Sequence, residues 1–153
     1  MKKILLPLLL AVLMSINTQA QSTAEAEIQK TIETLFDGMR AGDSSMVASA
    51  FSRDAIMQTV AKNREGKVVK SSGSLAQFLN AVGTPHDQVW DEKIASYDIK
   101  VDADLATAWT PYKFYAGENF SHCGVNSFQL AKLDGEWKII YIIDTRRRDN
   151  CIE

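Results

Sequence analysis

The stretch SHCGVNSFQLAKLDGEWKIIYIIDTRR, residues 121–147, decides the fold, because it has the pattern of two long strands joined by a tight turn. Asp134-Gly135 is a dipeptide typical of the two-residue β-hairpin turn. With these residues in the turn, their two neighbours pair with each other. The same register carried to the far ends of the strands pairs His122 with Arg147. The sequence therefore predicts an antiparallel pair with a defined register.

Side chains alternate between the two faces of a sheet, so this register assigns every residue to one face. One face is apolar near the turn and becomes polar toward the far end. Its apolar members are Phe128, Leu130, Trp137, Ile139 and Tyr141, and its polar members are His122, Asn126, Thr145 and Arg147. An apolar floor with a few polar anchors is what a small-molecule pocket requires. We expect this face to line such a pocket.

The opposite face of the same hairpin carries Val125, Ile140 and Ile142. The register also places Asp144 there, away from the expected pocket. In a monomer, water would meet the three apolar side chains, whereas a second copy of the chain would cover them. We therefore expect a homodimer that forms through this outer face.

The rest of the chain places helices before strands. Apolar residues recur at helical spacing over residues 22–40, a short helix follows Asp43, and a third helix follows Ser74. The segments with the pattern of strands are 55–60, 67–70, 90–101 and 105–115. This order favours an α+β fold in which N-terminal helices pack on the concave face of a curved antiparallel sheet. The layers would enclose a cavity, in a cone-shaped α+β barrel.

The first 20 residues have the composition of an export signal. Lys2 and Lys3 precede an apolar run over residues 4–16, and small residues stand at Thr18 and Ala20. The apolar run is shorter than the roughly 20 residues that cross a bilayer. We expect cleavage after Ala20, one domain over residues 21–153, a periplasmic or secreted location, and no membrane association after cleavage.

Charge and composition exclude several classes of function. The chain is 46% apolar and 24% charged, with a net charge of −2 that becomes −4 if Lys2 and Lys3 are removed. A mildly acidic domain without a basic stripe is a poor partner for nucleic acid. Two His and two Cys make no zinc site, since adjacent His122 and Cys123 point apart on a strand. No phosphate-binding loop or nucleophile motif occurs either. We expect no metal, no cofactor and no nucleic-acid partner.

The two cysteines, Cys123 and Cys151, can form a disulfide in an exported chain. The register places Cys151 about five residues beyond the residue that pairs with Cys123. A straight strand could not join them, but a C-terminal tail that folds back could. Both the bridged and the unbridged forms stay open from the sequence.

Several segments of the chain resemble the nuclear transport factor 2-like superfamily, in particular its exported bacterial members of the lumazine-binding-like and polyketide-cyclase-like groups. The segments that carry the resemblance are 28–40, Gly42-Asp43, 106–109, 112–115, 121–130 and 134–139. The resemblance implies a cone of curved sheet and helices, often a homodimer. It also implies either an enzyme, such as an isomerase, dehydratase or cyclase, or a protein that only binds a ligand.

His122 is the best acid–base candidate, because a neutral imidazole suits proton transfer near pH 7. Tyr112 can donate its hydroxyl, but its face depends on the loop at Gly117. A three-residue loop pairs Phe114 with His122 and turns Tyr112 inward, whereas a two-residue loop turns it outward. Asn126 can hold a ligand carbonyl or amide, or it can satisfy a backbone group.

Residues 146–148 are three consecutive arginines at the end of the last strand. Successive side chains on a strand point in opposite directions, so the three cannot converge there. Arg147 alone is expected at the pocket mouth, where it could bind a carboxylate or phosphate. Thr145 accompanies it on the same face.

Three functions remain open from the sequence. The first is an exported, non-catalytic protein that binds a small, partly apolar molecule. The second is a general acid–base enzyme in which His122 is the base and Tyr112 or Asn126 polarises a carbonyl. The third is a structural or partner-binding role for the dimer.

Overall fold

The computed structural model describes residues 5–152, with side chains from Thr23 onward. Lys2 and Lys3 of the predicted export signal lie outside the described residues, as do the side chains at its predicted cleavage site. No helix among the described residues combines the length and the apolar composition needed to cross a bilayer.

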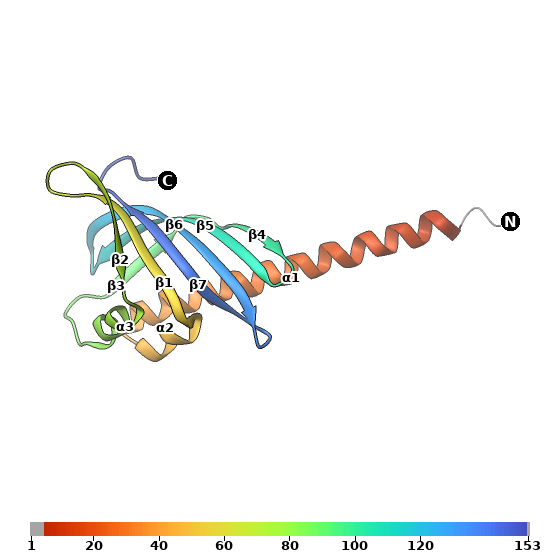
Figure 1. The fold of residues 1–153 in the computed structure, drawn as a ribbon, viewed down its shortest axis with the longest axis horizontal. Helices are drawn as coiled ribbons and strands as arrows, with labels where there is room; N and C mark the ends of the chain where they lie inside the picture. The colour runs from red at the N-terminus through yellow and green to blue at the C-terminus, as the bar shows by residue number, and fades with distance from the viewer. Residues whose placement is uncertain (1–4, 153) are drawn as a thin grey trace.

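Three helices precede most of the sheet. Helix α1 spans Leu5–Ala41, α2 spans Ser44–Ala50 and α3 spans Leu75–Gly83. The predicted apolar stripe on α1 is confirmed, because Ile28 and Ile32 are fully buried. Asp43 caps α2, its carboxylate accepting hydrogen bonds from the backbone N–H groups of Ser45 and Met46 at 2.9 Å each. Figure 1 shows α1 running beneath the sheet, with α2 and α3 beside its C-terminal end.

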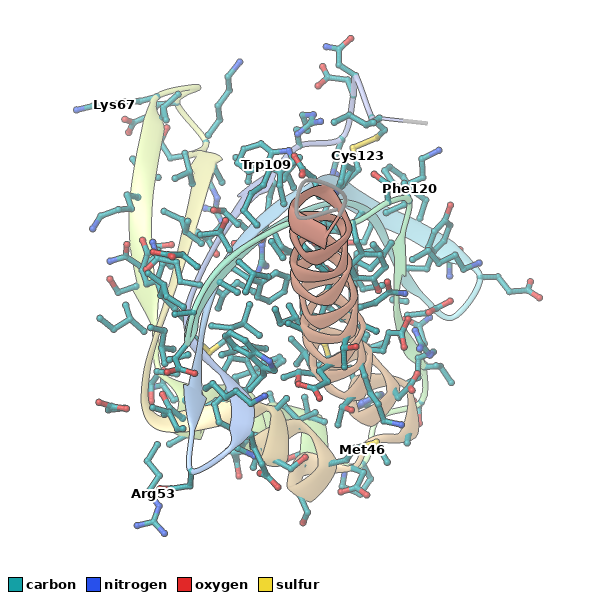
Figure 2. The ribbon with its side chains drawn as sticks, turned by 90° about the vertical axis from the view of Figure 1, so that its right-hand side faces the viewer. Met46, Arg53, Lys67, Trp109, Phe120 and Cys123 are labelled. Atoms are coloured by element: carbon teal, nitrogen blue, oxygen red, sulfur yellow. A yellow bond between two sulfur atoms is a disulfide. The ribbon has the colours of Figure 1, made fainter. Side chains whose placement is uncertain are left out.

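The described residues form a seven-stranded sheet. Six of its strands follow the order β2-β1-β7-β6-β5-β3, and the seventh, β4, pairs with β5. Their bounds are β1 Phe51–Lys62, β2 Val68–Gly73, β3 Trp90–Ile94, β4 Asp98–Asp102, β5 Leu105–Ala116, β6 Asn119–Leu133 and β7 Glu136–Arg146. The sheet curves around α1, as the view along that helix shows (Figure 2). The α+β fold with helices on the concave face is confirmed. The sheet is mixed and not wholly antiparallel, because β1 pairs in parallel with β7.

The segment 90–101 is two strands and not the single strand expected. β3 and β4 both pair with β5, but Ile94 lies opposite Tyr112 whereas Asp98 lies opposite Trp109. The register therefore changes where Pro111 stands between these partners. Proline has no N–H for a sheet ladder, and here its carbonyl accepts from Ala95 N at 2.9 Å.

The last hairpin begins as predicted and then departs from its register. Leu133 pairs with Glu136 and Leu130 pairs with Ile139, but Gln129 pairs with Tyr141. One extra residue, Ile140, is therefore accommodated in β7 as a β-bulge. Bulges increase the local twist and bend of a strand, which a long hairpin in a coiled sheet requires.

The bulge exchanges the two faces of β7 beyond Ile140. Phe128 now pairs with Ile142 and Asn126 with Asp144, so Ile142, Asp144 and Arg146 face the helices. Tyr141 and Thr145, which the sequence placed inside, face outward. The assignment of faces was thus wrong for the second half of β7. The same shift makes Asp144 an interior residue.

The outer patch expected for dimerisation is also changed. Ile142 lines the interior cavity, and Val125 is only 6% exposed in the single chain. Of the three residues predicted for this patch, only the bulge residue Ile140 is left as a partly exposed side chain. The predicted surface is therefore wrong in its composition, while dimerisation itself stays a prediction.

The turn at Gly117 has two residues, because Ala116 pairs with Asn119. An irregularity between Phe114 and Tyr115 nevertheless restores the pairing of Phe114 with His122. Tyr112 is consequently on the concave side and is 2% exposed. The structure combines the shorter of the two loops considered with the inward orientation expected of the longer one.

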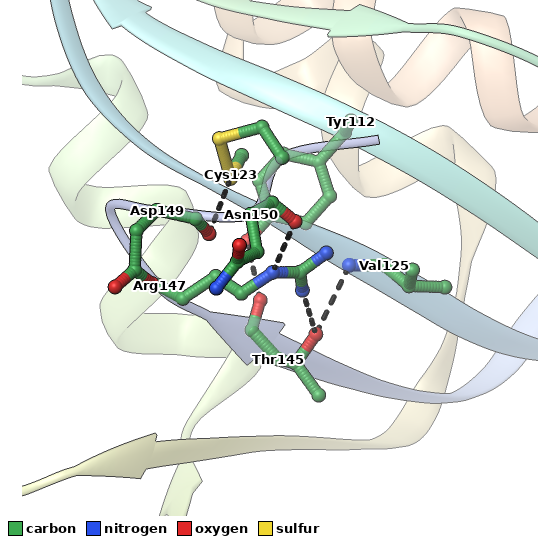
Figure 3. The surroundings of a disulfide bond; sticks show 8 residues. Tyr112, Cys123, Val125, Thr145, Arg147, Asp149 and Asn150 are labelled. Carbon is green, nitrogen blue, oxygen red and sulfur yellow. Dashed lines mark hydrogen bonds between the residues drawn. A yellow bond between two sulfur atoms is a disulfide. The ribbon is translucent and has the colours of Figure 1, made fainter. Parts of the chain in front are cut away.

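Cys123 and Cys151 form a disulfide, with their Cα atoms 5.7 Å apart. The tail folds back as such a bridge requires. Arg147 makes an isolated β-bridge with Cys123, and Asn150 adopts a left-handed φ of 50° before Cys151. Figure 3 shows the tail lying against the start of β6 around the disulfide. The bridge holds residues 147–151 close to the end of the sheet.

Candidate functional site

A cavity of about 560 Å³ lies between the helices and the concave face of the sheet. Its walls are mainly apolar, and they come from α1, α3 and several strands. The apolar side chains are Leu35, Phe36, Met39, Phe51, Met57, Phe78, Trp90, Phe114 and Ile142. Its polar side chains include Thr59, Glu92, His122, Asn126, Asp144 and Arg146. The predicted combination of apolar walls and polar anchors is present, with a partly different set of anchors.

Two of the five predicted ligand-binding residues, His122 and Asn126, line this cavity. Tyr112 lies on the concave side behind Asp144 and is not among the lining residues. Thr145 is on the outer face, where its hydroxyl accepts from Val125 N at 3.1 Å. Arg147 is there too, since it donates from Nη1 to Thr145 Oγ1 at 3.4 Å and from Nε to the Asn150 carbonyl at 3.1 Å (Figure 3). The bulge at Ile140 places both residues outside the pocket in which the sequence predicted them.

Glu92 and Asn126 form one half of the polar lining. Asn126 is 3% exposed, and its Nδ2 donates to Glu92 Oε1 at 2.7 Å and to Thr110 Oγ1 at 3.4 Å. Strand β3 presents Glu92 to the cavity because Trp90, two residues earlier, lines it as well. The carboxyl group of Glu92 therefore meets the cavity at its boundary with β6.

The other half of the polar lining of the cavity is centred on Asp144. Its Oδ1 accepts from the Thr59 hydroxyl at 2.5 Å, and its Oδ2 accepts from Arg146 Nε at 2.7 Å. The Tyr112 hydroxyl lies 3.1 Å from Oδ2 and 3.0 Å from the Thr145 carbonyl, so it can donate to either. Asp144 is 7% exposed. Side chains of three strands, β1, β5 and β7, thus hold this carboxyl group in place.

The two carboxyl groups have different surroundings. The pKa of Glu92 is raised to about 8, mainly by burial and in addition by the charge of Asp144, while the hydrogen bond from Asn126 and the charge of Arg146 oppose the rise. Glu92 is therefore largely protonated at neutral pH and can donate a proton or a hydrogen bond. Burial also raises the pKa of Tyr112, which stays a neutral donor.

The imidazole of His122 lies against the aromatic rings of Phe114 and Tyr112, and its neutral form is favoured. Burial lowers its pKa, and the nearby positive charge of Arg146 lowers it further. Its Nδ1 lies 3.0 Å from Ser121 Oγ, and its ring centroid lies 5.0 Å from that of Phe114. It makes no hydrogen bond to a carboxyl group among the described residues. An acid–base role for His122 would need such a titratable partner or a substrate beside it.

Sequence reasoning missed Glu92 and Asp144 for different reasons. Glu92 lies within a predicted strand whose faces were not assigned, although period-two spacing from Trp90 places it on the cavity face. Asp144 was assigned outside because the bulge was not foreseen. The unbroken apolar run 139–143 lacks the alternation that would have fixed the face of β7.

The described residues contain no group of three or more His, Cys, Asp or Glu side chains placed to hold a metal ion. The side chains that line the cavity can form hydrogen bonds and transfer protons through carboxyl, imidazole and guanidinium groups.

Comparison with known proteins agrees with this architecture. The family model described as putative lumazine-binding matches residues 23–142. No curated protein matches the chain. A protein of unknown function from Mycobacterium tuberculosis is similar, with a TM-score of 0.70 and 17% identity, over 87% of this chain and 77% of that one.

Two solved structures from Novosphingobium aromaticivorans are similar as well. An NTF2-like protein with a cystatin-like fold has a TM-score of 0.67 and 12% identity, over 88% of this chain and 89% of its own. A putative scytalone dehydratase has a TM-score of 0.69 and 14% identity, over 89% and 92%. At these identities the likeness shows the fold alone. The family match covers most of the chain, and the chain therefore belongs to the putative lumazine-binding family, with the fold of NTF2-like proteins.

Proposed function

We propose that this protein binds a small, partly apolar organic molecule in the cavity between α1, α3 and the sheet. The observation that carries this proposal is a cavity of about 560 Å³ whose apolar walls end at two hydrogen-bonded carboxyl groups, Glu92 and Asp144. Pockets of this size and polarity are typical of small-molecule sites. The family description, putative lumazine-binding, supports the same interpretation.

The cavity suggests how the ligand is held. Flat or branched apolar groups would pack against Phe36, Phe78 and Trp90, which lose little conformational entropy on binding. A protonated Glu92 donates to a ligand oxygen or ring nitrogen. Asp144 already accepts hydrogen bonds from Thr59 and Arg146, so it contributes mainly by fixing its neighbours.

A fluorescent apolar probe, N-phenylnaphthylamine, tests cavity binding. Its emission is expected to rise with the wild-type protein. Ala81 lines the cavity on α3, so Ala81→Trp would fill part of that space and weaken binding at least about tenfold. The matched control, Ala26→Trp on the exposed side of α1, leaves binding unchanged. Equal binding by both variants would place the probe elsewhere and refute the proposal.

Acid–base catalysis is a second candidate, favoured by a protonated Glu92 and a neutral His122 lining one cavity. Glu92 would protonate a substrate oxygen, and His122 would accept a proton from carbon or water. Tyr112 was one of two residues expected to polarise a carbonyl, and it is a weaker candidate for this role because its hydroxyl is already hydrogen-bonded to Asp144 and the Thr145 carbonyl.

The catalytic alternative has a direct test. Wild-type protein and Glu92→Gln, which keeps the hydrogen bond from Asn126, are incubated with a small-molecule extract and analysed by mass spectrometry. A product formed by the wild type and not by the variant supports catalysis. Identical extracts after both incubations leave binding as the function.

Export and dimerisation are also part of the proposal. N-terminal sequencing of the protein from its native host is expected to begin at Gln21, and an intact Met1 would contradict export. For the dimer, the exposed side chains of Ile56 (54%) and Trp109 (53%) supply apolar surface in place of Ile142. Light scattering that reports a monomer at high concentration would exclude the dimer and with it the partner-binding alternative.

A further inference from the structure

A second hollow, of about 670 Å³, opens at the rim of the sheet between the end of β1 and the C-terminal tail. We call it the rim hollow, and its lining includes Lys62, His122, Arg146, Arg148 and Asp149. His122 and Arg146 also line the cavity. The two spaces therefore adjoin at these two side chains.

The rim hollow is strongly basic. The side chains of Lys62 and Arg148 are exposed and make no ion pair or hydrogen bond within the part of the chain that the structure describes. Arg146 uses only Nε on Asp144, so its two terminal nitrogens are left to donate to a ligand. The lining also includes Arg147. Asp144 balances the charge of Arg146, and Asp149, the one acid among the described lining residues, does not balance Lys62, Arg147 and Arg148 together. The positive charge that remains is what an oxyanion requires.

Arg146 and Arg148, two positions apart, lie on one side and Arg147 on the other, as the alternation of a strand predicts; the expectation that Arg147 alone lies at the pocket mouth is wrong. β7 ends at Arg146, and Arg147 still makes an isolated β-bridge with Cys123. The guanidinium of Arg147 turns to the outer face and ties down the tail through the Asn150 carbonyl. The disulfide of Cys151 with Cys123 then holds the tail over the rim (Figure 3). Arg146 and Arg148 are left on the side of His122, where both charges act on the imidazole.

The inner end of the cavity is, by contrast, neutral as a whole. Asp144 is paired with Arg146, and Glu92 is hydrogen-bonded to the amide of Asn126. An anion placed there would meet the carboxylate of Asp144, whereas at the rim it meets the cations of Lys62 and Arg148. Charge therefore orients a ligand with its apolar body inside and its anionic head outside.

We propose that the rim hollow binds the oxyanion head, a carboxylate, sulfonate or phosphate, of a ligand whose apolar body occupies the cavity. The inference rests on the proposed binding function and narrows it to amphipathic anions. Arg148 and Lys62 are the residues that select for the head, and Arg146 joins the two spaces.

Two probes with the same aromatic body, one with and one without an anionic head group, distinguish binding of the head from binding of the body. Anilinonaphthalene sulfonate carries an anionic head, and N-phenylnaphthylamine lacks it. The wild-type protein is expected to bind the sulfonate at least about tenfold more tightly, because charge-assisted hydrogen bonds form only with it. About 0.5 M sodium chloride weakens binding of the sulfonate and leaves the neutral probe unaffected, because salt screens the exposed charges.

Substitutions in the lining of the rim hollow test where the anionic head group binds. Lys62→Ala/Arg148→Ala is expected to bring the sulfonate to the affinity of the neutral probe. Lys30→Ala/Arg53→Ala removes the same two charges from exposed positions away from the rim and changes neither affinity. Cys151→Ser frees the tail and is expected to lower the affinity for the sulfonate alone.

The outcomes distinguish the rim site from the proposed binding of an apolar molecule in the cavity, on which it rests. Equal affinities of the wild type for the two probes, or no loss with Lys62→Ala/Arg148→Ala, would overturn the rim site. Loss of the neutral probe in Ala81→Trp would still uphold the cavity in that case. If the wild type binds neither probe, the rim site and the cavity both fail.

Discussion

The protonation of Glu92 makes the stability of this protein fall as pH rises through the neutral range. The folded protein holds the pKa of Glu92 at about 8, against 4.5 for the free side chain. Between these values the folded state binds a proton that the unfolded chain does not. The stabilisation from this proton is complete below about pH 4.5 and is lost as pH rises to about 8.

The size of this effect follows from the same two values. The interval from 4.5 to about 8 corresponds to roughly 5 kcal/mol for a group fully shielded from water. Glu92 is partly exposed to the cavity, so we expect about half, or roughly 2 to 3 kcal/mol. Glu92→Gln cannot ionise and keeps an acceptor for Asn126, so it should not lose this stability.

Urea unfolding from pH 5 to 8.5 measures the effect as the difference between the wild type and Glu92→Gln in free energy of unfolding. The difference removes the contributions of the other titratable groups, which both proteins share. Glu65→Gln, on the exposed β1–β2 turn, is the control and should follow the wild type. A wild-type profile as flat as that of Glu92→Gln would refute the assignment of a protonated carboxyl to this cavity.

Three further changes test the structure around the site by urea unfolding. Gly124→Ala should destabilise by more than about 3 kcal/mol, because its Cβ would lie 1.7 Å from the Thr145 carbonyl oxygen. In Gly73→Ala the nearest atom to the new Cβ lies at 3.9 Å, an ordinary contact distance, so that change should cost far less; equal losses would contradict the close approach of β6 and β7. Cys151→Ser should cost about 3 to 4 kcal/mol for a sequence separation of 28 residues, and a reductant should then have no further effect; an unchanged midpoint would mean that no bridge forms. Tyr112→Phe should cost about 1 kcal/mol, since it removes one hydroxyl from the buried Asp144, and no loss would show that the bond to Asp144 is absent.

The parts of the fold that the sequence predicts correctly are those with local signals. Asp134-Gly135 fixes the turn, and the pairing of Leu130 with Ile139 follows from it directly. The stripe from Ile28 to Met39 predicts which side of α1 is buried. These patterns depend on neighbours in the chain, so no knowledge of the tertiary fold is needed to see them.

The parts that it does not predict depend on contacts between distant segments. The parallel pairing of β1 with β7 joins residues at least 85 positions apart and has no local signature. The bulge at Ile140 lies in a run of apolar residues that are compatible with either face. Asp144 is drawn inside because Thr59 of β1 and Tyr112 of β5 both meet it there, and neither partner is visible from the hairpin alone.

The bulge at Ile140 also decides the chemistry of the cavity. With an uninterrupted register, β7 would present Tyr141, Ile143, Thr145 and Arg147 to the helices, a face with one cation and no acid. With the bulge it presents Ile142, Asp144 and Arg146, so a carboxylate neutralises the cation inside the cone. Because that cation is balanced, the excess positive charge of the arginine run is left to Arg148 at the rim. A shift of one residue thus separates a neutral, apolar interior from a basic entrance, and this separation is what would let one protein bind the body and the head of an amphipathic anion at different places.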